Sequence, residues 1–195
     1  MKQDAFYDLV NREKLSALIQ RTETPCYFYF ADILRHQIDR IRACVGDRFE
    51  VHYALKANPN PEILKTLVAS GVGADVASGN ELCMSLAAGA PPAMIEFSGP
   101  GKRAKELELA VDTGIGSINI ENLTEIDAIA NIAARLGKVA RVGLRLNPGK
   151  LAGSSGMRMA GDTQFGLTMH DAKLALEQIK THAPHLNFTG FHAHL

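Results

Sequence analysis

The stretch EVHYALKANPNPEILKTLVASGVGADVAS at residues 50–78 carries the pattern that decides the fold. Its apolar start, 50–55, predicts a strand. Asn60 and Pro61 are typical of a helix start, and Gly71 is typical of a helix end. Residues 74–78 predict the next short strand. The stretch therefore predicts a strand, a helix and a second strand in succession.

The same unit recurs along the chain with a period of roughly twenty to twenty-five residues. A helix that ends at Gly89 follows the second strand, and later helices are predicted at 102–113, 122–136 and about 169–182. Further strands are predicted at 95–99, 117–121, 140–147 and 188–195. Strands that alternate with helices imply right-handed crossovers and a parallel sheet, so the fold class is α/β.

An open doubly wound sheet and a closed barrel both fit this order of elements. The chain has no glycine-rich dinucleotide turn, which favours a (β/α)8 TIM barrel. Such a barrel normally needs about 250 residues. We therefore expect about six of its eight units here, with further units beyond residue 195.

The chain is predicted to divide into a lead-in at 1–45 and a partial barrel at 46–195. In the lead-in we expect an amphipathic helix from about Gln3 to Arg21 and a second helix from about Asp32 to Cys44. Between them, TPCYFYF at 24–30 predicts a strand, because it is rich in aromatic residues and follows a proline.

Composition excludes several classes of protein. The formal net charge is zero, so nothing favours nucleic acid or an anionic membrane surface as a partner. No apolar run approaches the ~20 residues of a membrane-spanning helix, and the N-terminus lacks the apolar block of a secretory signal. The three scattered cysteines fit neither a metal site nor a disulfide framework. We expect a cytoplasmic protein without a metal.

Polar side chains stand at the carboxyl end of every predicted strand, where a barrel places its active site. They are Lys56, Asp75, Ser78, Ser98, Glu121, Asn122, Arg145, Asn147, His192 and His194, and Gly99 stands among them. Lys56 is the most informative, because a lysine that is partly desolvated at such a rim becomes a nucleophile for carbonyl groups. The alternative is an ordinary surface lysine at a strand end.

Four motifs in order resemble one known family. YALKAN at 53–58 and DVASGNEL at 75–82 are similar to the lysine motif of the fold-type III pyridoxal-phosphate-dependent decarboxylases and to the motif that follows it. GLRLNP at 143–148 resembles the family's fifth-strand arginine motif, and GFHAHL at 190–195 resembles its sixth-strand histidine motif. The family includes the ornithine, arginine and diaminopimelate decarboxylases.

The resemblance implies decarboxylation of an amino acid with pyridoxal 5'-phosphate as cofactor. Lys56 would carry the cofactor as a Schiff base, His194 would stack on its ring, Asp75 would orient Lys56, and Arg145 would join the hydrogen bonds near the phosphate. Each has a structural alternative: His194 as a strand histidine bonded to a carbonyl, Asp75 as a helix N-cap, and Arg145 in an interior ion pair. Glu81 would support this network or only occupy a first helical turn. We expect His192 in the core or behind the site.

The resemblance also indicates a homodimer when the protein is full length. The family's glycine-rich phosphate loop, the carboxylate that faces the pyridine nitrogen, and the β-domain with the substrate cysteine would lie beyond residue 195. TPCYFYF would belong with that β-domain. The residues that select the amino acid are therefore outside this sequence.

Two segments are similar to a subgroup from secondary-metabolism and exopolysaccharide clusters. They are SGPGK at 98–102 and GSSGMRMAGDTQFG at 153–166, where Gln164 replaces the lysine usual before PheGly. Some members of this subgroup act on carrier-tethered or derivatised amino acids. We therefore expect the substrate to be diaminopimelate, ornithine, or a carrier-tethered or derivatised amino acid. We expect the glycine-rich stretch 149–163 to be a mobile rim loop rather than a phosphate cradle, because no helix opens directly from it.

Three other interpretations remain open. A racemase of the alanine racemase type shares the barrel and the lysine, but its lysine motif normally continues with tyrosine and glycines, whereas Asn58 runs into ProAsnPro. A non-catalytic, decarboxylase-like binding protein is disfavoured by Lys56 and His194, which are both retained. The third is a fragment that has no function by itself.

Overall fold

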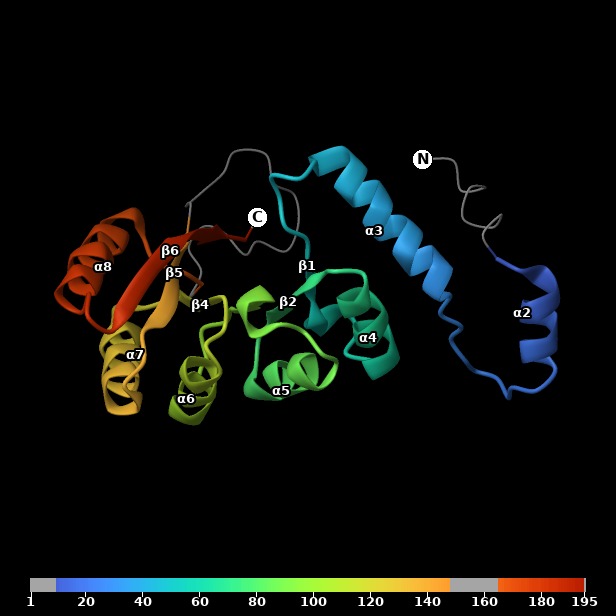
Figure 1. Cartoon of the computed structure of the whole chain (residues 1–195), viewed down its shortest axis with the longest axis horizontal. Helices are drawn as coiled ribbons and strands as arrows, with labels where there is room; N and C mark the ends of the chain where they lie inside the picture. Colours follow the sequence, from blue (N-terminus) through green and yellow to red (C-terminus); the bar gives the residue numbers. More distant parts are fainter. Residues whose placement is uncertain (1–9, 148–164, 195) are drawn as a thin grey trace.

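The computed structural model describes residues 10–147 and 165–194 (Figure 1). Six strands form one sheet in chain order, and every neighbouring pair is parallel. The strands are β1 (His52–Ala54), β2 (Gly73–Val76), β3 (Ile95–Phe97), β4 (Ser117–Ile120), β5 (Ala140–Leu146) and β6 (Leu186–Ala193). This order confirms the predicted α/β fold, in which six parallel strands make up part of a barrel.

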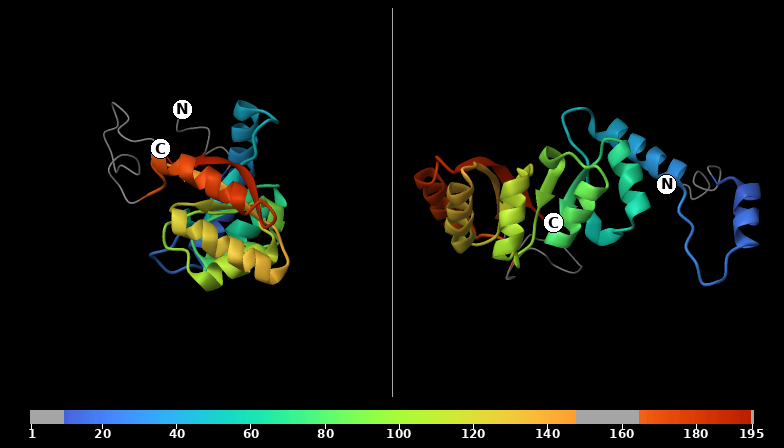
Figure 2. Two further views of the ribbon diagram at one scale, coloured as in Figure 1. Left: turned by 90° about the vertical axis from the view of Figure 1, so that its left-hand side faces the viewer. Right: turned by 60° about the horizontal axis from the view of Figure 1, so that its bottom comes forward.

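The helices that join the strands line one side of the sheet in a curved row, whereas the other side is left open (Figures 1 and 2). They are α4 (Pro61–Ala69), α5 (Gly79–Ala87), α6 (Ala104–Thr113), α7 (Leu123–Leu136) and α8 (Met169–Thr181). Asn60 caps α4 as predicted, because its side chain accepts the amide of Glu62 at 2.9 Å. Gly114 and Gly137 end α6 and α7 in the left-handed conformation.

The apolar core lies between the sheet and this row of helices. Alternate strand residues such as Val76, Phe97, Ile120 and Val142 are fully buried there. The residues between them, which face the open side, are mainly polar: Asp75, Glu96, Asn119, Arg141 and Arg145. A typical barrel fills this inner face with branched apolar side chains, so the polar inner face is a distinctive feature of this chain.

The lead-in contains α2 (Arg12–Ile19) and α3 (Ala31–Val45), and α2 stands at the far end of the molecule (Figure 1). The part of the first predicted helix before residue 10 lies outside the described residues. Ile38 of α3 packs with Ile63, Leu67 and Val72, which attaches α3 to the barrel. None of the helices within residues 10–147 and 165–194 has the length and apolar character needed to cross a bilayer.

The strand predicted at 24–30 is wrong. Residues 26–30 have no regular secondary structure and pair with no strand of the described chain, and Tyr27 is 88% exposed. Strand propensity measures how well a residue fits a pleated, half-buried surface. None of the six strands offers such a surface to this segment, so the aromatic pattern alone does not produce a strand.

Candidate active site

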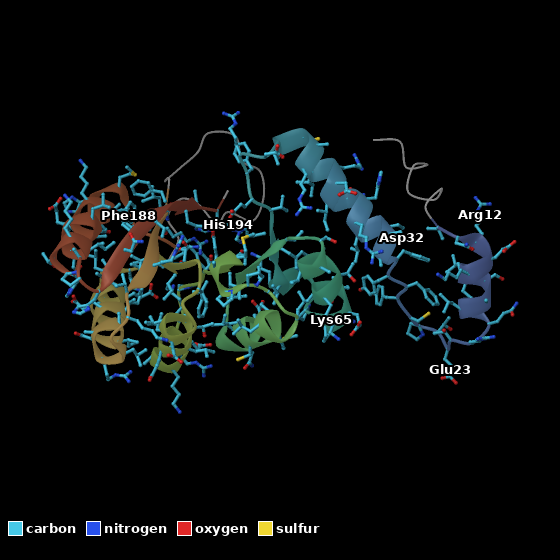
Figure 3. All side chains as sticks on the ribbon, viewed as in Figure 1. Arg12, Glu23, Asp32, Lys65, Phe188 and His194 are labelled. Carbon is cyan, nitrogen blue, oxygen red and sulfur yellow. The ribbon has the colours of Figure 1, made fainter. Side chains whose placement is uncertain are left out.

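One cavity at the carboxyl ends of the strands brings together all four predicted site residues. Lys56, Asp75, Arg145 and His194 line it, and they follow or belong to β1, β2, β5 and β6. The remaining lining residues are Ala77, Ser98, Gly99, Pro100, Phe165 and His192. His194 lies at the carboxyl end of β6, far from Arg12 and Glu23 in the lead-in (Figure 3). The roles of the four residues stay predictions.

Lys56 lies in a short 3-10 helix, Leu55–Ala57, immediately after β1. Leu55 beside it is fully buried and anchors the turn to the core. Asn58 closes the turn, because its carbonyl accepts the Tyr53 hydroxyl at 3.2 Å and its side-chain amide donates to the Tyr29 hydroxyl at 2.9 Å. Lys56 itself is exposed, contrary to the partial desolvation that we expected, because the inner side of the six-stranded sheet is open.

Asp75 faces the cavity from β2, opposite Ala54 of β1. Its Oδ1 is buried and has no hydrogen-bond partner among the residues that the structure describes. The N-cap of α5 is Ser78 instead, whose hydroxyl accepts the amide of Glu81 at 3.2 Å. Glu81 in turn accepts the amide of Ala77 at 2.7 Å. Of the alternatives that the sequence left open, Asp75 is therefore not a cap, and Glu81 stabilises the first turn of α5.

Arg145 is buried in β5, where it both makes an interior ion pair and lines the cavity. Its Nη1 donates to Glu121 Oε1 at 2.6 Å, which is the interior ion pair, and the same side chain lines the cavity. The guanidinium lies over the Phe165 ring, 5.1 Å from the centroid. Nη2 is buried and has no hydrogen-bond partner in the described part of the chain. Arg145 is thus held by Glu121 and Phe165, with Nη2 remaining for a ligand.

His192 of β6 and His194, which directly follows the strand, both line this cavity. Desolvation lowers the pKa of His194, and the positive charges of Lys56 and Arg145 lower it further. Desolvation also lowers the pKa of His192, followed by the charge of Arg145. His192 Nδ1 is buried, and no described residue makes a hydrogen bond to it. The sequence contained a signal for His192, since residues two apart on a strand share a face.

A second cavity continues the polar inner face away from the rim. It is lined by His192, which belongs to both cavities, and by residues that include His52, Glu96, Ser117, Asn119, Arg141 and Thr189. Asn119 Nδ2 donates to Ser98 Oγ at 3.1 Å, and the hydroxyls of Ser117 and Thr189 lie 3.1 Å apart. A chain of polar groups therefore extends from the site into the barrel interior.

Phe165 was missed by the sequence analysis. It reaches the site because residues 165–167 return along β5: Leu167 donates to the Arg145 carbonyl and accepts from Asn147, each at 2.8 Å. No local pattern predicts where a segment returns. The rim loop expected at 149–163 lies outside the described residues, as does Gln164.

The residues present fit a cofactor such as pyridoxal phosphate. Three residues that line the cavity with Lys56 each carry a buried polar atom that has no hydrogen-bond partner among residues 10–147 and 165–194: Asp75 Oδ1, Arg145 Nη2 and His192 Nδ1. Buried polar atoms are normally hydrogen-bonded, so these atoms indicate a ligand that is polar and in part anionic. Within the described ranges, no cluster of three His, Cys, Asp or Glu side chains is placed to hold a metal.

Comparison with known proteins identifies the class. Residues 31–195 match the family model described as pyridoxal-dependent decarboxylase, pyridoxal binding domain. The chain belongs to this family, and its cofactor is pyridoxal 5'-phosphate, as the four motifs predicted.

Individual relatives agree. The chain is 38% identical over 178 residues to a diaminopimelate decarboxylase of Zymomonas mobilis, covering 88% of this chain and 42% of the relative. It is 34% identical to the L-glutamyl-[BtrI acyl-carrier protein] decarboxylase of Niallia circulans, covering 93% of this chain and 42% of that protein. The structure of diaminopimelate decarboxylase from Helicobacter pylori complexed with L-lysine matches with a TM-score of 0.86 and 33% identity, covering 93% of this chain and 46% of that one. The chain thus spans less than half the length of these relatives.

Proposed function

We propose that the full-length protein is a pyridoxal-phosphate-dependent amino-acid decarboxylase, a carboxy-lyase, with Lys56 as the residue that holds the cofactor covalently. The observation that carries the proposal is the convergence of Lys56, Asp75, Arg145 and His194 on one cavity. The bound cofactor supplies an electron sink for the bond that breaks when carbon dioxide leaves the amino acid. The protein supplies binding, orientation and charge.

Lys56 provides the amine, and Asp75 provides a carboxylate beside it. Asp75 belongs to the strand next to Lys56 and has a free oxygen in the cavity. A carboxylate in that place can accept a hydrogen bond from the lysine amine and so fix its orientation. Asp75 is therefore proposed to orient Lys56 rather than to act on the substrate.

Arg145 and His194 are proposed to contact two different parts of the cofactor, the phosphate and the ring. Arg145 has a free Nη2 donor, which suits an anionic phosphate. His194 has a lowered pKa, so its imidazole is neutral at pH 7 and can cover an apolar ring face without a buried charge. With one face of the ring covered in this way, proton donors and acceptors can approach only from the other face.

The substrate is proposed to be an amino acid: diaminopimelate, ornithine, or a carrier-tethered or derivatised amino acid. The relatives named above support both the free and the tethered kind, since one is a diaminopimelate decarboxylase and another acts on a glutamyl group on an acyl-carrier protein. The match to a decarboxylase model favours this activity over a racemase.

The full-length protein loaded with pyridoxal phosphate tests the proposal. Borohydride should trap the cofactor on Lys56, carbon dioxide should be released from one of these substrates, and Lys56→Ala should abolish both. Lys65→Ala is the matched control, because Lys65 is exposed on α4 and paired with Glu62. A trapped adduct on another lysine in the Lys56→Ala protein would refute the assignment.

Three further expectations belong to the same proposal. The protein works in the cytoplasm, supported by three cysteines that are exposed and unpaired. It forms a homodimer when full length, supported by its family resemblance and testable by sedimentation. Residues 1–45 lead into the pyridoxal-binding barrel of residues 46–195, and limited proteolysis near residue 45 tests that boundary.

A further inference from the structure

Behind the cavity, four charged side chains form two buried ion pairs. Lys102 Nζ lies 3.1 Å from Glu125 Oε2, and Arg145 Nη1 lies 2.6 Å from Glu121 Oε1. The four side chains are between 0% and 8% exposed. Lys102 lies in the loop after β3, and Glu121 directly follows β4. Glu125 lies in the first turn of α7, and Arg145 lies in β5. We call Lys102, Glu121, Glu125 and Arg145 the charge cluster.

Backbone groups join the two pairs into one unit. Glu125 Oε2 accepts the amide of Glu121 at 2.9 Å, so the second pair fixes the backbone that carries the first. Lys102 Nζ also donates to the carbonyl of Asn119 at 2.8 Å. The charge cluster therefore ties the ends of β3, β4 and β5 together.

The Gly99 peptide is held by the charge cluster from both sides. Its amide donates to Glu121 Oε1 at 2.6 Å, and its carbonyl accepts from Lys102 Nζ at 2.6 Å. Gly99 has a φ of 120°, a conformation that favours glycine. Gly99 and Arg145 both line the cavity, so the charge cluster contacts the site at two points.

Fold stability alone gives a weak reason for such a cluster. Burial disfavours both charges of the second pair, since desolvation is the main cause that lowers the pKa of Lys102 and raises the pKa of Glu125. Replacing a buried ion pair with apolar side chains is often neutral or stabilising. A geometric role explains the charge cluster better. Glu121 holds Arg145 and Gly99, which both line the cavity, and Glu125 holds the backbone amide of Glu121.

We propose that Glu121 is a positioning residue for cofactor binding. It fixes the Arg145 guanidinium and the Gly99 amide with one oxygen, Oε1, while Lys102 and Glu125 fix Glu121 and Gly99 from behind. Arg145 lines the cavity, and among the described residues its Nη2 has no hydrogen-bond partner that would compete with a ligand. This inference rests on the proposed function, since it concerns the same cavity.

A double-mutant cycle on the full-length protein tests it. The dissociation constant of pyridoxal phosphate is measured for wild type, Glu121→Gln, Arg145→Gln and the double variant, each checked for a folded state by thermal unfolding. Glu121→Gln should weaken binding by roughly 10- to 100-fold, the size of one lost hydrogen bond to a charged group. With Arg145 already replaced, it should weaken binding much less, because the two residues act through the same contact.

Glu108→Gln is the matched control. Glu108 accepts from Arg135 at 3.1 Å on the outer helices, so this variant also loses one ion pair but should keep cofactor affinity. An unchanged dissociation constant for Glu121→Gln, or the same loss in both backgrounds, overturns the positioning role and leaves a structural one.

A second variant covers the case in which Glu121→Gln does not fold. Lys102→Met combined with Glu125→Gln removes both charges of the Lys102–Glu125 pair, so neither partner is left buried and unpaired. It should weaken cofactor binding several-fold in folded protein, and unchanged affinity overturns the inference. Failure of the proposed function would look different. The wild-type protein would then bind no pyridoxal phosphate in a way that depends on Lys56, and the inference would fail together with the proposed function.

Discussion

His192 lies directly opposite Arg145 in the pairing of β5 with β6. The guanidinium charge beside a partly buried imidazole disfavours the protonated form, in addition to desolvation, so the pKa of His192 falls below its ordinary value. At neutral pH the imidazole is therefore uncharged, and its free Nδ1 faces a site in which Arg145 is already the cation. The pairing of these two strands thus sets the charge at the inner end of the site.

Folding stability should rise with pH around the ordinary pKa of histidine. The pKa of His192 is lowered on folding, so the unfolded chain binds more protons in that range and stability is lost as pH falls below about 6.5. Urea unfolding of the chain between about pH 5 and 8 measures the slope. His192→Gln should reduce it, whereas exposed His170→Gln should not. His194, whose pKa is also lowered, should leave part of the slope in place, so a slope that is unchanged in His192→Gln would contradict the prediction.

Glu106 should stabilise the fold until strongly acidic pH. Hydrogen bonds from the Arg103 side chain and the amides of Gly79 and Arg103 lower its pKa to about 2. Its contribution is present above the ordinary value of 4.5 and is lost as pH falls toward about 2. Glu106→Gln should be less stable than wild type at pH 7, and the difference should shrink with acidification. Glu177→Gln, at an exposed pair on α8, should show no such trend.

Gly116→Ala should destabilise the fold by roughly 1–3 kcal/mol, the usual cost of overpacking. A Cβ at this position would collide with the Ala93 carbonyl, which is backbone and cannot rotate away. The comparison is Gly101→Ala, where a Cβ meets nothing within 4 Å. Denaturant unfolding of both variants measures the effect, and equal stability would mean that β4 shifts without cost.

His194→Ala should weaken retention of pyridoxal phosphate and lower turnover by roughly 10²–10⁴-fold, as for a lost positioned group. His194 lines the cavity beside Lys56, so the loss should be seen both in cofactor dissociation and in kcat. His182→Ala removes a histidine that pairs with Asp127 at 2.8 Å on the outer helices and should leave both unchanged. Wild-type cofactor retention in His194→Ala would exclude the stacking role.

Residues 1–195 by themselves should show no decarboxylase activity and should bind pyridoxal phosphate only loosely. Lys56 is exposed, and in the described sheet β1 and β6 each pair on one side only, which leaves the site open to water and two edges free. Carbon dioxide release by this polypeptide, lost on Lys56→Ala, would show that these residues suffice.

The sequence by itself determined the order and type of nearly all elements of the barrel. Hydrophobic periodicity, Asn60 at a helix start, and Gly114 and Gly137 at helix ends are local signals, and each is read within one unit. The same local logic placed Lys56, Asp75, Arg145 and His194 at one rim, because parallel strands bring their carboxyl ends together.

Only the tertiary structure decided what those residues contact. TPCYFYF has strand composition but no strand beside it, so it stays unpaired in the described chain. Glu121, a rim position in the sequence, bonds to Arg145, and Lys102 bonds to Gly99 and Asn119, through contacts that join separate units. The physical reason is that periodicity and capping act over a few residues. An ion pair or a strand partner instead depends on segments that lie far apart in the sequence and that folding brings together.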